Sequence, residues 1–269
     1  MLGLKLYQVD AFATDLFSGN PAGVCVVDET LFANGALLQE IAAEMNLSET
    51  VFAVGRSGSG FALRWFTPTV EVPICGHATL SCAHILYETG AVSRDAQIVF
   101  SGQSGELRAK RCGDLVELDF PLFRVHKTKP PKEAMRALGV KPVSYAQEGE
   151  WAVVEVGTEE ELRALSPDFV ALKDMEPADW IVTCASADPA FDFCSRMFAP
   201  AVGIDEDPVT GAAHCVLAPY WESKLGKKSF RARQLSARGG IVECETSGER
   251  VVLRGRAITV FDIDMRISL

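Results

Sequence analysis

The chain has 269 residues, a net charge of −10 and a pI near 5.0, and this length suits two modest domains. It has no cluster of lysines and arginines that would give a basic surface, so we expect no nucleic-acid partner. Eight cysteines are scattered through apolar segments without a CxxC pair, which indicates reduced thiols and a cytoplasmic location. The first residues lack the pattern of a signal peptide, and no apolar run approaches the roughly 20 residues that span a bilayer, so we expect no membrane partner.

The first half of the chain alternates short strands with two helices. A turn cluster, "FSGNPAG", separates the first two strands. Apolar residues between 37 and 45 recur with helical spacing, and Asn46 follows as a stop. A second helix, rich in small residues, opens at Gly76. The expected strands lie at 4–10, 23–27, 50–54, 61–66, 97–102, 105–110 and 115–120.

The second half begins after a basic, proline-bearing stretch, "HKTKPPKEAMRALGV", which favours a domain junction near 118–130. Thr158 and Glu161 form a capping-box pattern that predicts a helix start. A further small, apolar helix opens at Gly211. Strands are expected at "WAVVEV", "DWIVTCAS", "FDFCSRMF", "SFRARQL", "GGIVECE", "RVVLRG" and "AITVFDI".

An internal repeat relates the two halves. The segment "RWFTP" at Arg64 recurs as "RMFAP" at Arg196, and each is followed by a glycine, Gly76 or Gly211, that opens a small-residue helix. The order of the predicted elements repeats as well. This pattern predicts two similar domains.

The two repeated helices carry few charges on any face, which is typical of helices buried within a sheet layer. We therefore predict an α+β fold of two pseudo-symmetric domains, each a curved, barrel-like sheet wrapped around a central helix. The predicted domains are 1–120 and 121–257, with a C-terminal strand at about 258–269 returning to the first. The helix N-termini would open toward a cleft between the domains, where unpaired N–H groups suit a carboxylate.

Four ordered segments, "DAFATDLFSGNPAGVCVV", "EMNLSETVFA", "RWFTPTVEVPICGHATL" and "DEDPVTGAAHC", resemble the phenazine-biosynthesis isomerase-like (PhzF-like) family over nearly the whole chain. That family shares its two-domain fold with diaminopimelate epimerase. The resemblance implies an isomerase without cofactor or metal, acting on a small carboxylate substrate and often assembled as a homodimer. The characterised member shifts a proton on trans-2,3-dihydro-3-hydroxyanthranilate with a glutamate base.

The resemblance also assigns residues. The glutamate base corresponds to Glu49 in "NLSET", and the other predicted catalytic residues are His77 and Asp207. Ala212 stands where the family often has a serine that helps hold the substrate, so the resemblance does not extend to the phenazine substrate itself. The predicted substrate-binding residues are Cys75, Gly76, Thr210, Gly211 and Ala212.

Each of these residues also has a purely structural interpretation. Glu49 resembles a solvated surface carboxylate, His77 a histidine hydrogen-bonded within the first helical turn, and Asp207 a charge favoured by a helix N-terminus. His84 lies two turns inside the same predicted helix as His77, so we interpret it as a core histidine. The two repeated arginines are interpreted as braces for loops.

Cys75 raises two further alternatives. A zinc site built from Cys75, His77, Cys82 and His84 fits no common ligand spacing. A two-thiol racemase would need a partner cysteine just before Gly211, where the chain has none, although a helix N-terminus is expected to lower the pKa of Cys75 and make it reactive.

Three functions therefore stand side by side. The first is a cofactor-independent isomerase with Glu49 as general base. The second is an amino-acid racemase or epimerase that uses Cys75. The third is a non-catalytic protein that binds small acids.

Overall fold

The computed structural model describes residues 2–58 and 60–267, and the chain divides into two compact units. Unit 1 comprises 1–119 and 254–269, and unit 2 comprises 120–253. The sequence predicted boundaries at 120 and about 257. Each unit is described by itself below.

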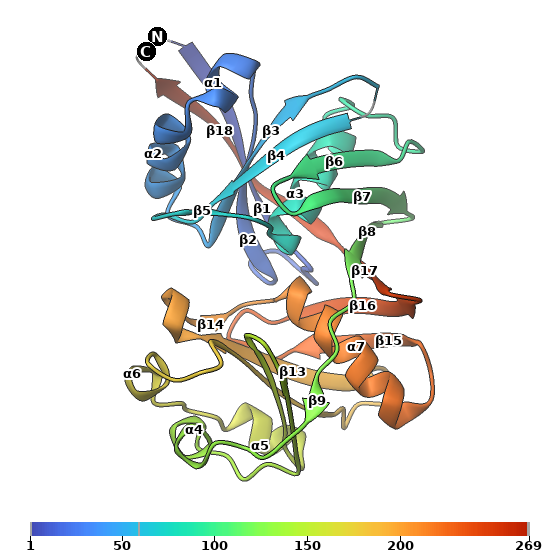
Figure 1. Cartoon of the computed structure of the whole chain (residues 1–269). Helices are drawn as coiled ribbons and strands as arrows, with labels where there is room; N and C mark the ends of the chain where they lie inside the picture. Colours follow the sequence, from blue (N-terminus) through green and yellow to red (C-terminus); the bar gives the residue numbers. More distant parts are fainter. Residues whose placement is uncertain (1, 59, 268–269) are drawn as a thin grey trace. The chain divides into compact units, whose positions relative to one another are not determined.

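Unit 1 is a curved sheet with helices on its faces (Figure 1). The last strand of the chain returns to pair antiparallel with the first, and the first also pairs antiparallel with the second. The second and third strands are parallel, the third and fourth are antiparallel, and the fourth and sixth are parallel. The strands are β1 (Leu2–Ala11), β2 (Asn20–Val26), β3 (Glu49–Gly55), β4 (Gly60–Phe66), β5 (Glu71–Val72), β6 (Ile98–Gly102), β7 (Gly105–Cys112), β8 (Leu115–Pro121) and β18 (Ala257–Ile267); the helices are α1 (Glu29–Ala33), α2 (Gly35–Met45) and α3 (Gly76–Glu88).

Helix α3 is the centre of unit 1. Most of its residues are buried, and it contacts β1, β2, β3, β7 and β18. Because it is enclosed by strands, it carries no Asp, Glu, Lys or Arg before its last turn, as the sequence indicated. Trp65 on β4 donates from Nε1 to Thr79 Oγ1 at 3.1 Å and ties the sheet to the helix.

Unit 2 repeats this plan. Five consecutive neighbours in its sheet pair alternately parallel and antiparallel, beginning with a parallel pair. The strands β2, β3, β4, β6 and β7 of unit 1 alternate in the same order. The elements are β9 (His126–Lys127), α4 (Lys132–Leu138), β10 (Ser144–Glu148), β11 (Trp151–Glu155), α5 (Glu159–Arg163), α6 (Phe169–Leu172), β12 (Asp179–Ala185), β13 (Phe193–Ala199), η1 (Pro200–Val202), β14 (Ile204–Asp207), α7 (Gly211–Leu225), β15 (Ser229–Gln234), β16 (Gly240–Ser247) and β17 (Arg250–Gly255). The predicted repeat and the α+β class are thus confirmed.

Helix α7 continues past a proline. Pro219 lies inside the helix, where it cannot donate to the carbonyl of Cys215 four residues earlier. The backbone N–H of Phe123 donates to that carbonyl instead, at 3.2 Å. The helix therefore keeps its buried acceptor satisfied, and the segment that enters unit 2 is fixed against it.

The repeated arginines act as braces in both units. Arg64 donates to both carboxylate oxygens of Glu71 at 2.7 Å and to the carbonyl of Phe32. In unit 2, Arg196 pairs with Glu206 at 2.6 and 2.8 Å and reaches the carbonyl of Leu165. In each unit the guanidinium joins the strand to the hairpin that leads to the central helix, so the structural interpretation of these arginines holds.

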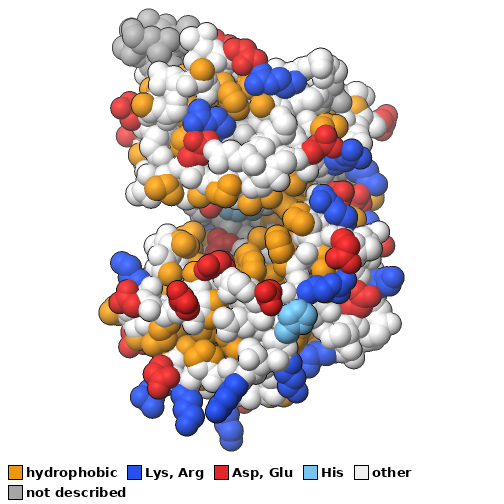
Figure 2. Space-filling model, viewed as in Figure 1, with side chains coloured by type: hydrophobic (Ala, Val, Ile, Leu, Met, Phe, Trp, Pro, Cys, Tyr) orange, Lys and Arg blue, Asp and Glu red, His pale blue; other side chains and the backbone are white. Residues whose placement is uncertain are grey.

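No helix in the described part of the chain is both long enough and apolar enough to cross a bilayer. Figure 2 shows basic and acidic side chains on the same face of each unit.

We predict that Arg196→Lys lowers the free energy of unfolding by about 2 kcal/mol. The planar guanidinium donates to Glu206 and to backbone carbonyls at the same time, and a lysine ammonium cannot make all of these hydrogen bonds. Urea denaturation measures the change. Arg124→Lys is the matched control, because Arg124 pairs with Glu249 at an exposed position and exposed pairs contribute little. Equal stabilities of the two variants would contradict the bracing role.

Candidate functional site

Two backbone turns bring a carboxylate and a helix start together in unit 1. Asn46 ends α2 in the left-handed conformation (φ +49°), and β3 then begins at Glu49, opposite Ala22 of β2. Helix α3 begins at Gly76, after Cys75 in extended backbone. The N-cap residue, Cys75, makes no capping hydrogen bond with its side chain, so the first turn can accept an anion.

Three of the predicted residues meet here. His77 Nε2 lies 3.2 Å from Glu49 Oε2, and Cys75 Sγ lies 3.5 Å from His77 Nδ1. All three side chains are largely buried, at 13% exposure for Glu49, 7% for His77 and 7% for the whole Cys75 residue. Glu49 Oε2 is buried, and no hydrogen bond reaches it from the residues that the structure describes.

Asn20, which the sequence analysis did not single out, supports this group. Its side chain is fully buried, Nδ2 lies 3.3 Å from His77 Nδ1, and Ser48 Oγ donates to Oδ1 at 3.4 Å. Gly19 makes this placement possible, since a Cβ there would lie 2.3 Å from the carbonyl of Ala11. The signal was the "SGNPAG" cluster, which was interpreted as a turn and as part of a family segment, without a role for its asparagine.

Burial and charge set the protonation of this group. Burial alone would lower the pKa of His77, but the Cys75 sulfur and the Glu49 carboxylate outweigh it, and the pKa lies well above its ordinary value. The pKa of Cys75 is raised, chiefly by burial and then by Glu49. The expectation that the helix N-terminus lowers this pKa is therefore wrong, because loss of hydration at a buried sulfur exceeds the effect of the helix.

The predicted residues of unit 2 form a second group. Asp207 ends β14 and is 8% exposed, and Thr210 donates from Oγ1 to its carboxylate. Gly211, which is buried, and Ala212, which is partly exposed, then open α7. Both central helices thus begin at a glycine without a side-chain cap.

Gln234 holds this loop in place and was also missed. Its amide oxygen accepts from the backbone N–H of Thr210 at 2.9 Å, and Nε2 donates to the carbonyl of Asp207 at 2.8 Å. Gln234 is fully buried at the end of β15. Nothing in its sequence context distinguishes it from an ordinary strand residue.

The structure therefore brings Glu49, Cys75, Gly76 and His77 together in unit 1, and Asp207, Thr210, Gly211 and Ala212 together in unit 2. That the two groups serve one substrate stays a prediction.

The zinc set considered from the sequence does not assemble. His84 lies 3.1 Å from Thr259 Oγ1, and Cys82 is buried inside α3. The potential ligand atoms that do converge belong to Glu49, Cys75 and His77, all within 4.8 Å of one another.

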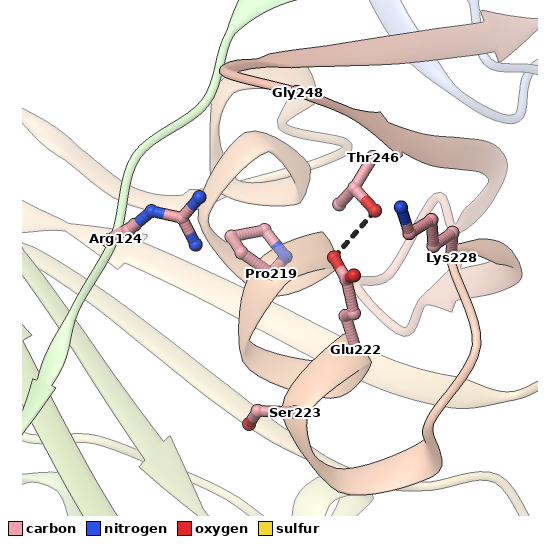
Figure 3. Close-up of a pocket in the computed structure, with 7 residues that line it drawn as sticks. All are labelled: Arg124, Pro219, Glu222, Ser223, Lys228, Thr246 and Gly248. Carbon is pink, nitrogen blue, oxygen red and sulfur yellow. Dashed lines mark hydrogen bonds between the residues drawn. The ribbon is translucent and has the colours of Figure 1, made fainter.

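An open pocket of about 390 Å³ lies elsewhere in unit 2 (Figure 3). At its centre, Thr246 Oγ1 donates to Glu222 at 2.6 Å. It contains none of the predicted site residues. Its lining residues are Arg124, Pro219, Glu222, Ser223, Lys228, Thr246 and Gly248.

A sequence profile described as phenazine biosynthesis-like protein matches residues 9–263. The chain belongs to this family. It is 43% identical to an uncharacterised isomerase of Halalkalibacterium halodurans over 261 residues, which are 97% of both chains. The crystal structure of a PhzF-family phenazine biosynthesis protein from Enterococcus faecalis superposes with a TM-score of 0.93 at 38% identity, covering 99% of this chain and 100% of that one.

The family membership confirms the isomerase class that the sequence motifs indicated. The fold extends beyond the family: a probable proline racemase from Agrobacterium radiobacter has a TM-score of 0.67 at 12% identity, covering 98% of this chain and 93% of that one. This likeness supports the predicted epimerase-like architecture.

One carboxyl of unit 2 makes stability depend on pH. Burial, followed by Glu150 and Asp207, raises the pKa of Asp179 to about 6. The unfolded chain therefore ionises this group more readily, and its contribution to stability falls as pH rises from about 4 to about 6.

We predict that Asp179→Asn stabilises the protein by roughly 2 kcal/mol at pH 7 and by almost nothing at pH 4. Urea denaturation at the two pH values measures the difference. Asp174→Asn, at an exposed position, is the control. A gain for Asp179→Asn that is the same at both pH values would contradict the assigned cause.

Proposed function

We propose that this isomerase moves a proton between two carbons of a small carboxylic acid without a cofactor, and that Glu49 is its general base. One observation carries the proposal: Glu49 Oε2 is buried, has no hydrogen bond from the described residues, and lies 3.2 Å from His77 Nε2. A buried carboxylate oxygen without a hydrogen bond is costly for stability, and in a native structure such a group calls for a functional explanation.

The proton transfer needs only this carboxylate. Glu49 takes a proton from a carbon next to an activating group, and the electron pair of the C–H bond moves into the adjacent unsaturated system. The resulting carboxylic acid then returns the proton at a second carbon. No atoms or electrons are gained or lost, and a positioned base of this kind contributes about 10²- to 10⁴-fold to the rate.

His77 would stabilise the charge that develops during the transfer. A histidine whose pKa is well above its ordinary value carries a proton at neutral pH. On the Nδ1 side of the ring, the Asn20 amide lies at 3.3 Å and accepts from an Nδ1–H when its oxygen is turned toward the ring. An imidazolium fixed in a buried site can donate to a substrate oxygen as negative charge accumulates there.

The remaining assignments concern binding. The first turn of α3, at Gly76 and Cys75, would accept the substrate carboxylate. On unit 2 we assign Asp207, with Thr210, Gly211 and Ala212, to recognition of a hydroxyl or amine of the same substrate. A homodimer, as the family resemblance implies, belongs to the same proposal.

We predict that Glu49→Gln lowers proton exchange at least 100-fold, since an amide cannot take the proton. NMR in D₂O, with trans-2,3-dihydro-3-hydroxyanthranilate and a panel of amino and hydroxy acids, would follow deuterium entering at carbon. Glu40→Gln, at an exposed position of α2, is the control and should exchange at the wild-type rate.

The outcomes separate the three functions. Exchange at the wild-type rate in Glu49→Gln would contradict the proposal, and abolition by Cys75→Ala alone would favour a thiol-based racemase. Binding of a small acid without exchange, unaffected by Glu49→Gln, would indicate a non-catalytic protein.

A further inference from the structure

The group at the start of α3 combines three kinds of metal ligand. Glu49 offers a carboxylate oxygen, Cys75 a sulfur and His77 a ring nitrogen, and these atoms all lie within 4.8 Å of one another. We propose that the three residues bind a zinc-type divalent cation, and that the bound cation inhibits the enzyme by occupying the lone pair of Glu49. The binding stands on the geometry alone, while the inhibition rests on the proposed function.

The spacing is close to what a single ion requires. Zinc ligands at ordinary bond lengths and tetrahedral angles lie about 3.4 Å apart for nitrogen and oxygen, and about 3.6 Å apart for nitrogen and sulfur. Here His77 Nε2 lies 3.2 Å from Glu49 Oε2 and 4.0 Å from Cys75 Sγ. Two of the three ligand spacings therefore lie within a few tenths of an ångström of the tetrahedral values, and the third, from the Glu49 oxygen to Cys75 Sγ, is within 4.8 Å.

Charge balance favours a cation in this buried position. A divalent ion bound to one carboxylate, one thiolate and one neutral imidazole gives a site with no net charge, so a buried charge is compensated rather than created. The thiol proton of Cys75 and the Nε2 proton of His77 leave to solvent as the sulfur and the ring nitrogen bind. Glu49, whose side chain is 13% exposed, gives the ion an approach from solvent.

The second ring nitrogen of His77 also has a partner, as metal-bound histidines require. Asn20 lies 3.3 Å from Nδ1, and its amide can present its oxygen to an Nδ1–H by a half-turn of the amide group. Ser48, whose hydroxyl can donate or accept, bonds Asn20 from the other side. The imidazole would thus be oriented with Nε2 toward the ion.

Occupancy and proton transfer exclude each other. Three protein ligands leave a fourth position of a tetrahedral ion for water, but the oxygen of Glu49 that binds the ion cannot also accept a proton from carbon. The inference therefore assigns an inhibitory site and not a cofactor.

Zinc binding is measured by competition with a chromophoric chelator, and Co²⁺ is added separately to detect the sulfur-to-cobalt charge-transfer absorption. Both experiments use the Cys112→Ser chain as background, because Cys112 is an exposed free thiol. In that background we predict that Cys75→Ser weakens zinc binding by more than about 100-fold and removes the charge-transfer band. Cys82→Ser, a change at a buried thiol of the same helix outside the group, leaves both unchanged.

Glu49→Gln is the second ligand variant, which keeps the inference testable if Cys75→Ser fails to fold, and it should also weaken zinc binding. Equal affinity in Cys75→Ser and Cys82→Ser, or a cobalt complex without the sulfur band, would overturn the site. If the site binds zinc, proton exchange by the wild type should stop with zinc and recover with EDTA. Zinc binding in a chain that exchanges no substrate would refute the proposed function and leave the metal site, whereas Glu49-dependent exchange without zinc binding would refute the site alone.

Discussion

The contact between Glu49 and His77 is the interaction on which the functional account depends. Two ionisable side chains are withdrawn from water, and one carboxylate oxygen faces a ring nitrogen at 3.2 Å without a hydrogen bond from the described residues. Such an arrangement costs stability in a resting protein. It becomes useful when a substrate or an ion supplies the missing partner, and for this reason the same atoms support both a proton-transfer function and a metal-binding inference.

The rest of unit 1 serves to hold this contact in place. The left-handed turn at Asn46 sets the start of β3, the close approach at Gly19 allows Asn20 to be buried, and the Trp65–Thr79 bond fixes α3 against the sheet. Unit 2 uses the same plan with different details. Its loop at Asp207 is held by Gln234, and its central helix is held by the bond from Phe123 to the carbonyl freed by Pro219.

Much of this architecture could be predicted because it depends on sequence patterns within single segments of the chain. Hydrophobic spacing, turn residues and the repeated arginine segments revealed the elements, the duplication and the two central helices, and the motif resemblance led to Glu49 and His77. Asn20 and Gln234 could not be found in this way, since their roles arise from contacts with residues far along the chain. The direction of the Cys75 pKa was also misjudged, because burial is a property of the packed structure, whereas the helix N-terminus is visible in the sequence.

The most direct measurement of the central claim is the protonation of His77, observed by ¹⁵N NMR of the histidine ring and assigned with a His77→Gln variant. At a pH above the ordinary histidine pKa of about 6.5, the account predicts a doubly protonated His77 ring in the wild type, because the Cys75 sulfur and the Glu49 carboxylate stabilise the charged form. Glu49 supplies the negative charge, since the raised pKa of Cys75 keeps its thiol protonated. In Glu49→Gln the same ring should be neutral. A neutral His77 in the wild type, or a charged ring in both proteins, would contradict the account.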